Sequence, residues 1–171
     1  INNLNQVPCP YQMGILDSFF SMPLIPIIET TRGCPFQCTF CADGKKVANR
    51  VFRYGEERIT KTLQYIANRA NNCDELVIAD LNFGMYDFDI STANTIARLQ
   101  KEKDYPLAVK ASAGKNKPEK IINVTKILKG SGFLGAALQS TDPEVLKAIK
   151  RDNIPTDKIM NLAEFGKEQG N

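Results

Sequence analysis

Apolar residues in this chain form short continuous runs, separated by longer stretches in which they recur every three or four positions. Continuous runs bounded by Gly, Pro or Asn are typical of strands, and the longer stretches are typical of helices with one buried face. Leu76–Ala79 is apolar throughout, as expected of a strand buried on both faces of a parallel sheet. The predicted strands are Leu24–Thr31, Leu76–Ala79, Leu107–Ala111 and Phe133–Leu138.

A helical pattern follows each predicted strand. In the first, Ile59, Leu63, Ile66 and Ala70 would share one face. Capping and stop signals mark the ends of the other helices. Ser91 can cap the second helix, Pro118 lies in the first turn of the third helix and Gly130 follows its last turn, and Thr141–Glu144 form a capping box for the fourth. The predicted helices run from Glu56 to just before Asn71, from about Ser91 to Lys103, from Pro118 to Gly130, from Thr141 to Arg151, and onward from a cap at Thr156.

Strand and helix therefore alternate four times, and crossovers of this length make the strands parallel. We predict an α/β fold with a parallel sheet that is too small to close into a barrel. In such folds, functional groups gather where the loops at the carboxyl ends of the strands converge. That rule selects residues 34–41, 80–84, 110–113 and 139–140, which we expect to face one another.

Three of the five cysteines, Cys34, Cys38 and Cys41, fall within eight residues in the spacing CxxxCxxC. Gly33 and Pro35 favour a loop here, although the same offsets would also fit one face of a helix. A loop with this spacing can wrap soft thiolates around one metal centre. Three thiolates on a four-iron cluster leave one iron open for chemistry.

Other interpretations of the cysteines remain open. A zinc-stabilised, non-catalytic binding module would need Cys9 or Cys73 as a fourth ligand, although the chain has no histidine and lacks paired CxxC motifs. An iron–sulfur electron carrier would normally use four thiolates. A disulfide is disfavoured by the odd cysteine count and the absence of a secretory signal upstream.

The motif, with Phe40 directly before its last cysteine, resembles the signature of radical S-adenosylmethionine (radical SAM) enzymes. Thr30–Cys41 and the lead-in Val7–Gly14 are similar to the branch that carries a cobalamin-binding domain upstream. The resemblance implies a partial, TIM-like barrel of six strand–helix units, of which this chain holds about the first four. Residues 1–22 would be an irregular connector and residues 23–171 a core truncated before its last strands, so we expect a fragment of a longer protein.

The same resemblance assigns roles around a [4Fe-4S] cluster and S-adenosylmethionine. Cys34, Cys38 and Cys41 would ligate the cluster. Phe40 would line the adenine, and Asp80 and Asn82 stand where the family often has Gly-Gly-Glu to hold the cofactor's amine. The remaining candidates are Lys110 and Ser112 for the ribose or the carboxylate, Ser140 and Arg151 for the methionine carboxylate, and Gln139, which replaces a frequent glutamate.

The implied chemistry is that of the cofactors. A reduced cluster would pass an electron to the sulfonium, and the resulting 5′-deoxyadenosyl radical would abstract hydrogen from a substrate that the sequence does not identify. An electron donor of the flavodoxin or ferredoxin type is implied, and cobalamin-dependent methyl transfer is one outcome for the full-length protein.

The composition excludes some classes of protein but does not identify a function. The 171 residues are 43% hydrophobic, enough for one domain's core, and a net charge of +3 gives no reason to expect a nucleic-acid partner. The longest apolar run, Met22–Ile28, contains two prolines and is too short to span a membrane. We expect a cytoplasmic protein, because reduced thiols can hold iron and sulfide there.

Overall fold

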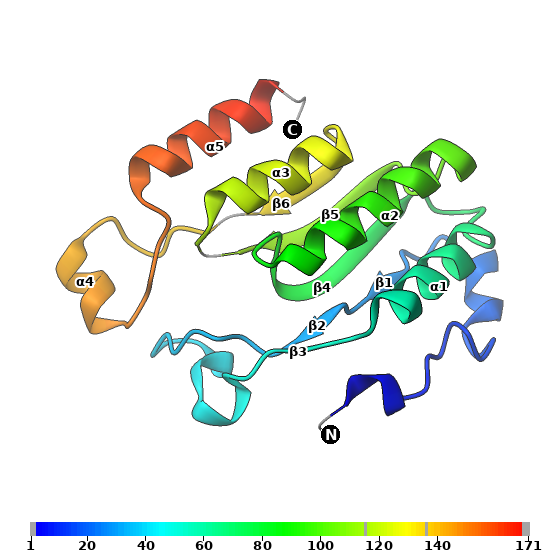
Figure 1. Ribbon diagram of the computed structural model, residues 1–171, viewed down its shortest axis with the longest axis horizontal. Coiled ribbons are helices and arrows are strands. Elements are labelled where there is room, and N and C mark those ends of the chain that lie inside the picture. Colours follow the sequence, from blue (N-terminus) through cyan, green and yellow to red (C-terminus); the bar gives the residue numbers. More distant parts are fainter. Residues whose placement is uncertain (1–2, 115, 136, 169–171) are drawn as a thin grey trace.

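A four-stranded parallel sheet organises the molecule (Figure 1). The computed structural model describes residues 3–114, 116–135 and 137–168. Each neighbouring pair of strands in the sheet is parallel, as predicted from the alternation of strand and helix. In spatial order the strands are β1 (Ile27–Ile28), β4 (Glu75–Phe83), β5 (Ala108–Ala113) and β6 (Gly132–Gly135).

Three helices, α1 (Glu56–Ala67), α2 (Asp87–Lys103) and α3 (Pro118–Leu128), cover one face of this sheet (Figure 1). Their apolar stripes meet the residues of the strands that point toward them, because alternate strand residues face opposite sides. The fully buried centre of this core includes Leu63, Ile66, Leu76, Ile78, Ile96 and Val109. The alternate residues of β4 and β5, such as Leu81 and Ser112, point to the other face.

The remaining elements lie around one end of the sheet and along its two outer edges (Figure 1). An antiparallel pair, β2 (Thr31–Arg32) and β3 (Phe52–Arg53), closes the base of a long loop that contains two short 3₁₀ turns, Ala42–Gly44 and Lys46–Ala48. After β6, α4 (Pro143–Ala148) leads to α5 (Thr156–Glu168), which packs against α3. The chain starts with two further 3₁₀ turns, Leu4–Gln6 and Asp17–Ser21.

Several side-chain contacts fasten the N-terminal arm to α1, and those of Arg58 reach three of its backbone carbonyls. Arg58 donates to the backbone carbonyls of Leu4, Asn5 and Val7, and its guanidinium lies 4.5 Å from the centre of the Tyr54 ring. These contacts hold an irregular segment in place without regular secondary structure.

Several predicted boundaries are wrong. The first strand pairs only at Ile27–Ile28, and α1 ends at Ala67 rather than near Asn71. The second strand is longer than predicted, because β4 continues to Phe83 through residues that were expected to form a turn. β5 likewise runs to Ala113, and β6 starts at Gly132 and ends at Gly135, so Ala137 and Leu138 lie outside it.

Helix starts were misplaced where another residue supplies the cap. α2 starts at Asp87, about one turn before Ser91, because the Asp89 carboxylate accepts a hydrogen bond of 2.9 Å from the backbone N–H of Tyr86. α4 is capped by Asp142, which accepts from two backbone N–H groups, and ends at Ala148 rather than at Arg151. Thr156 is the first helical residue of α5 rather than its cap.

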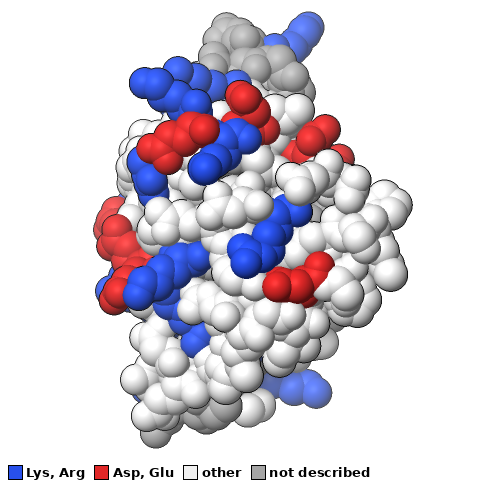
Figure 2. Space-filling view, turned by 90° about the vertical axis from the view of Figure 1, so that its right-hand side faces the viewer, with Lys and Arg blue, Asp and Glu red and all other residues white. Residues whose placement is uncertain are grey.

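The surface shows no separation of charge on the face opposite the long cysteine-containing loop. Figure 2 shows lysine and arginine side chains beside aspartate and glutamate side chains on that face. Within the described residues, no helix combines the length and the apolar character needed to cross a bilayer.

Candidate functional site

The cysteine motif lies on the long loop between β2 and β3, at the carboxyl end of β1. Cys34 and Cys38 are each 4% exposed and Cys41 is half-buried, and none of the three forms a disulfide. The backbone at these positions is irregular, so the alternative of a cysteine stripe on a helix is wrong. The motif forms a loop, as Gly33 and Pro35 predicted.

Two glycines shape this loop. Gly33 has φ of +103°, a conformation that side chains disfavour, and it turns the chain into the motif just before Cys34. At Gly44, a Cβ atom would lie 2.2 Å from the carbonyl oxygen of Cys38. The loop therefore folds back on itself so closely that only glycine fits at position 44.

The loop forms one wall of a pocket of about 240 Å³ that is partly open to solvent. The strand-end rule predicted the walls from the carboxyl ends of β4 and β5 and from the segment after β6. A further wall comes from the segment after α4, which that rule did not select. The pocket is lined by Cys34, Phe36, Cys38, Phe40, Cys41, Gly44, Leu81, Ser112, Ala113, Gly114, Ala137, Gln139, Arg151, Asn153, Ile154 and Ile159.

Seven of the eleven site residues proposed from the sequence therefore line one pocket. They come from four separate segments of the chain and are Cys34, Cys38, Cys41, Phe40, Ser112, Gln139 and Arg151.

Arg151 is held firmly at the pocket wall. It is 9% exposed; its Nε donates to Asn153 Oδ1 at 2.9 Å and its Nη2 donates to the carbonyl of Ala137 at 2.7 Å. Asn153 in turn donates to the carbonyl of Ser140 at 2.9 Å. Ser140 lies beside the pocket rather than in its wall, and its hydroxyl accepts from the backbone N–H of Asp142.

Asn82 contacts the cysteine motif directly. Its side-chain amide donates to Cys34 Sγ at 3.3 Å, and both residues are buried. The amide nitrogen of Asn82 thus lies against a proposed cluster ligand.

Asp80 lies behind the loop instead of in the pocket. Its carboxylate accepts from the Thr30 backbone N–H at 2.7 Å, from the Thr31 hydroxyl at 2.8 Å and from the Thr30 hydroxyl. Burial raises the pKa of Asp80 above its ordinary value, while the threonine donors act in the opposite direction. The three bonds fix the backbone immediately before the cysteine loop.

Lys110 is directed away from the cysteine loop. Its ammonium pairs with the Glu75 carboxylate at 2.7 Å, at the amino end of β4, and both side chains are partly exposed. Exposed ion pairs of this kind contribute about 0–1 kcal/mol to stability.

Sequence reasoning missed part of the pocket wall. Asn153 and Ile154 follow Arg151 in the same loop, and Gly114 follows the end of β5. The proximity of Asn153 to Arg151 in the chain was the available signal, since no period or motif marks it. Leu81 lies within residues 80–84, which the strand-end rule selected, although it was not named as a site residue.

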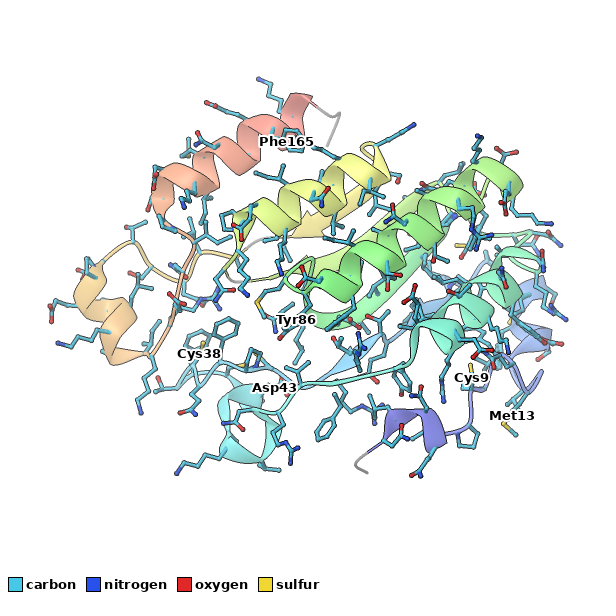
Figure 3. All side chains as sticks on the ribbon, in the orientation of Figure 1. Cys9, Met13, Cys38, Asp43, Tyr86 and Phe165 are labelled. Carbon is cyan, nitrogen blue, oxygen red and sulfur yellow. The ribbon has the colours of Figure 1, made fainter. Side chains whose placement is uncertain are left out.

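The remaining cysteines do not join the site. Cys9 lies against the Thr62 hydroxyl at 3.4 Å, and Figure 3 shows Cys9 beside α1, at the opposite end of the molecule from Cys38. Cys73 contacts the carbonyl of Glu75. In the described part of the chain, no three Cys, Asp or Glu side chains converge on a single-ion site, so a zinc site completed by Cys9 or Cys73 has no support. A cubane differs in that each cysteine binds a different iron, and its ligands stand further apart.

The family model described as the radical SAM superfamily matches residues 28–170, which is most of the chain. The chain belongs to the radical SAM superfamily. The match includes the cysteine loop and each of the other segments that line the pocket.

The related sequences are methyltransferases. The chain is 28% identical over 170 residues to the cobalamin-dependent radical SAM methyltransferase TokK of Streptomyces tokunonensis, covering 94% of this chain and 25% of that protein. It is 26% identical over 168 residues to 2-(S-pantetheinyl)-carbapenam-3-carboxylate methyltransferase of Streptantibioticus cattleyicolor, covering 93% of this chain and 24% of that protein. The chain thus spans about a quarter of the length of these relatives.

Solved radical SAM structures share the fold. The methyltransferase TsrM from Kitasatospora setae, with tryptophan and a SAM analogue bound, aligns with a TM-score of 0.71 at 13% identity, over 90% of this chain and 30% of that one. The cobalamin-dependent enzyme OxsB with aqua-cobalamin bound aligns with a TM-score of 0.65 at 18% identity, over 91% of this chain and 24% of that one.

Proposed function

We propose that this chain is the catalytic core of a radical SAM enzyme that holds a [4Fe-4S] cluster and S-adenosylmethionine in the pocket bounded by the cysteine loop. The observation that carries the proposal is that pocket, which joins the CxxxCxxC loop to the carboxyl ends of β4 and β5 and to Arg151. A radical enzyme needs this arrangement because the open iron must face the bound cofactor.

The donor set fits the cluster. Cys34, Cys38 and Cys41 lie on a single loop outside any disulfide, and thiolates are the ligands that iron–sulfur clusters require. Two of them are buried, which keeps water away from the metal. Three protein ligands leave a fourth iron to bind the cofactor's amine and carboxylate.

The pocket wall fits the cofactor. The two hydrogen bonds of Arg151 use two of its five N–H groups, and the others can meet a carboxylate. Phe40 offers a flat ring for an adenine, while Ser112 and Gln139 offer polar groups for a ribose or an amino acid moiety. The contacts of Asn82 and Asp80 favour supporting roles behind the cysteine loop over direct contact with the cofactor.

When bound, the cluster and the cofactor supply one-electron cleavage of a carbon–sulfur bond and a radical that takes hydrogen from the substrate. The chain's own residues would bind and orient the cofactor and the substrate, and would exclude water from them. Electrons would come from a flavodoxin- or ferredoxin-like donor.

Methyl transfer with cobalamin is our proposal for the full-length protein. Its support is that the relatives TokK, TsrM and OxsB are named as radical SAM methyltransferases or as cobalamin-dependent radical enzymes. In the same proposal, residues 1–22 connect the core to an upstream cobalamin domain. The core would be a partial barrel of six strand–helix units, of which this chain holds about the first four.

Anaerobic reconstitution of the full-length protein with iron and sulfide tests the proposal. We expect a brown protein with about four irons, whose electron paramagnetic resonance spectrum changes when S-adenosylmethionine is added. Cys38→Ala should abolish the cluster, while the matched variant Cys73→Ala should retain it. A colourless protein that binds one zinc ion per chain would refute the proposal.

A further inference from the structure

A buried hydrogen bond connects strand β4 to the first cysteine of the motif. The Asn82 amide nitrogen lies 3.3 Å from Cys34 Sγ, and the two residues are 3% and 4% exposed. A sulfur acceptor allows a longer hydrogen bond than oxygen does, and a buried bond of this kind is shielded from water. We propose that Asn82 raises the reduction potential of the bound cluster through this bond, an inference that rests on the proposed function.

The local structure explains why Asn82 can reach the sulfur. The pairing of β4 with β5 is irregular between Ile78 and Phe83, and the last part of β4 is buried at polar residues. Asp80 and Asn82 are two positions apart and so lie on the same side of the strand. Asp80 binds Thr30 and Thr31 at the base of the cysteine loop, and Asn82 binds Cys34 at its start. One strand therefore positions both the loop and its first ligand.

The direction of the effect follows from charge. A reduced cluster carries one more negative charge than the oxidised cluster, and that charge is shared with the cysteine sulfurs. The positive end of the Asn82 N–H dipole stabilises the more negative form to a greater extent. Hydrogen bonds to the sulfurs are among the factors that set cluster potentials. Asn82 is thus a positioning residue that also favours acceptance of the electron.

A purely structural role would be to hold Cys34 in place, and substitution can separate the two roles. Asn82→Leu keeps the approximate shape of the side chain and removes the donor. Asn82→Ala removes the donor with a smaller side chain and adds no charge beside the sulfur. Asn71→Leu is the matched control, because Asn71 is exposed just beyond the end of α1.

The experiment is a potentiometric titration of the anaerobically reconstituted full-length protein, followed by electron paramagnetic resonance of the reduced cluster. At the potential that half-reduces the wild-type cluster, we expect the reduced-to-oxidised ratio of Asn82→Leu to fall about tenfold, equivalent to about 59 mV for one electron. Asn71→Leu should match the wild type.

An unchanged potential in Asn82→Leu, at wild-type iron content, would overturn the inference. If Asn82→Leu assembles no cluster, Asn82→Ala decides, since a lowered potential supports the inference and an unchanged one overturns it. Cluster uptake by the wild type reports separately on the proposed function, so the two failures are distinguishable.

Discussion

The contact between Asp80 and the two threonines before the cysteine loop gives the sharpest prediction about stability. Thr30 and Thr31 are 0% and 5% exposed, so their donors have little access to water. Asp80→Ala would leave one backbone N–H and two hydroxyls without their acceptor. Each such group costs about 1–3 kcal/mol, and because the costs are not additive we expect a total of about 3–5 kcal/mol. Asp80→Asn keeps the shape and one acceptor oxygen and should cost about 1–2 kcal/mol.

The cost should fall on the cysteine loop, where a chemical probe can detect it. Cys34 is 4% exposed, so its alkylation in the apo protein requires the loop to open. Each 1.4 kcal/mol lost from the closed form raises the open fraction about tenfold. Asp80→Ala should therefore speed alkylation of Cys34 by about a hundredfold or more, as followed by mass spectrometry of quenched anaerobic samples.

Cys73 provides the internal control, because it lies before β4, away from the loop, and is already partly exposed. Its alkylation rate should hardly change. Urea denaturation of the same variants gives the global free energy of unfolding. The reasoning fails if Asp80→Ala costs less than about 1 kcal/mol, or if Cys34 and Cys73 accelerate equally.

Three further substitutions test other parts of the structure. Gly44→Ala places a Cβ 2.2 Å from the Cys38 carbonyl oxygen, so it should reduce iron content on reconstitution, whereas Gly55→Ala, which meets only a flexible side chain, should not. Burial raises the pKa of Asp89 from 3.8 to about 6, so its contribution to the free energy of unfolding is full below about pH 3.8 and is lost as the pH rises through about 6. The loss is worth up to about 3 kcal/mol. Asp89→Asn should flatten this decline in stability, as measured by urea denaturation at pH 4–7. Arg151→Lys cannot reproduce the two hydrogen bonds of the guanidinium, and should weaken S-adenosylmethionine binding at least about tenfold in equilibrium titrations at wild-type iron content.

The pattern of apolar residues predicted most of the elements because burial of one face sets their period. Ile59, Leu63 and Ile66 had to share a face of α1, whatever they packed against. The same reasoning placed the four strands and made them parallel. The apolar pattern did not predict the ends of the helices, because a single hydrogen-bonding side chain determines where each helix starts. The Asp89 carboxylate lets α2 start about one turn earlier than predicted, and Asp142 rather than Thr141 caps α4.

Spacing and chain topology predicted much of the candidate site. The three cysteines are close in the sequence, so their common location required no knowledge of the fold. Ser112 comes from a distant segment, and the rule for parallel strand ends was enough to bring it to the pocket. Arg151 follows a helix, and only the family resemblance pointed to it. Lys110 follows the same rule by position, yet its long side chain pairs with Glu75, because tertiary partners rather than chain position determine where a flexible charged group ends.

Asp80 and Asn82 show most clearly what a sequence leaves undetermined. After the apolar run Leu76–Ala79, two polar residues suggest the end of a strand and a solvated turn, but β4 continues through both of them to Phe83. It can do so because each buried polar side chain meets a partner from a segment about 50 residues earlier: Thr30 and Thr31 for Asp80, and Cys34 for Asn82. Burying either group without its partner would cost more than the extra strand pairing provides. The length of β4 and the position of the cysteine loop are therefore determined together, and a change at either one should alter the other.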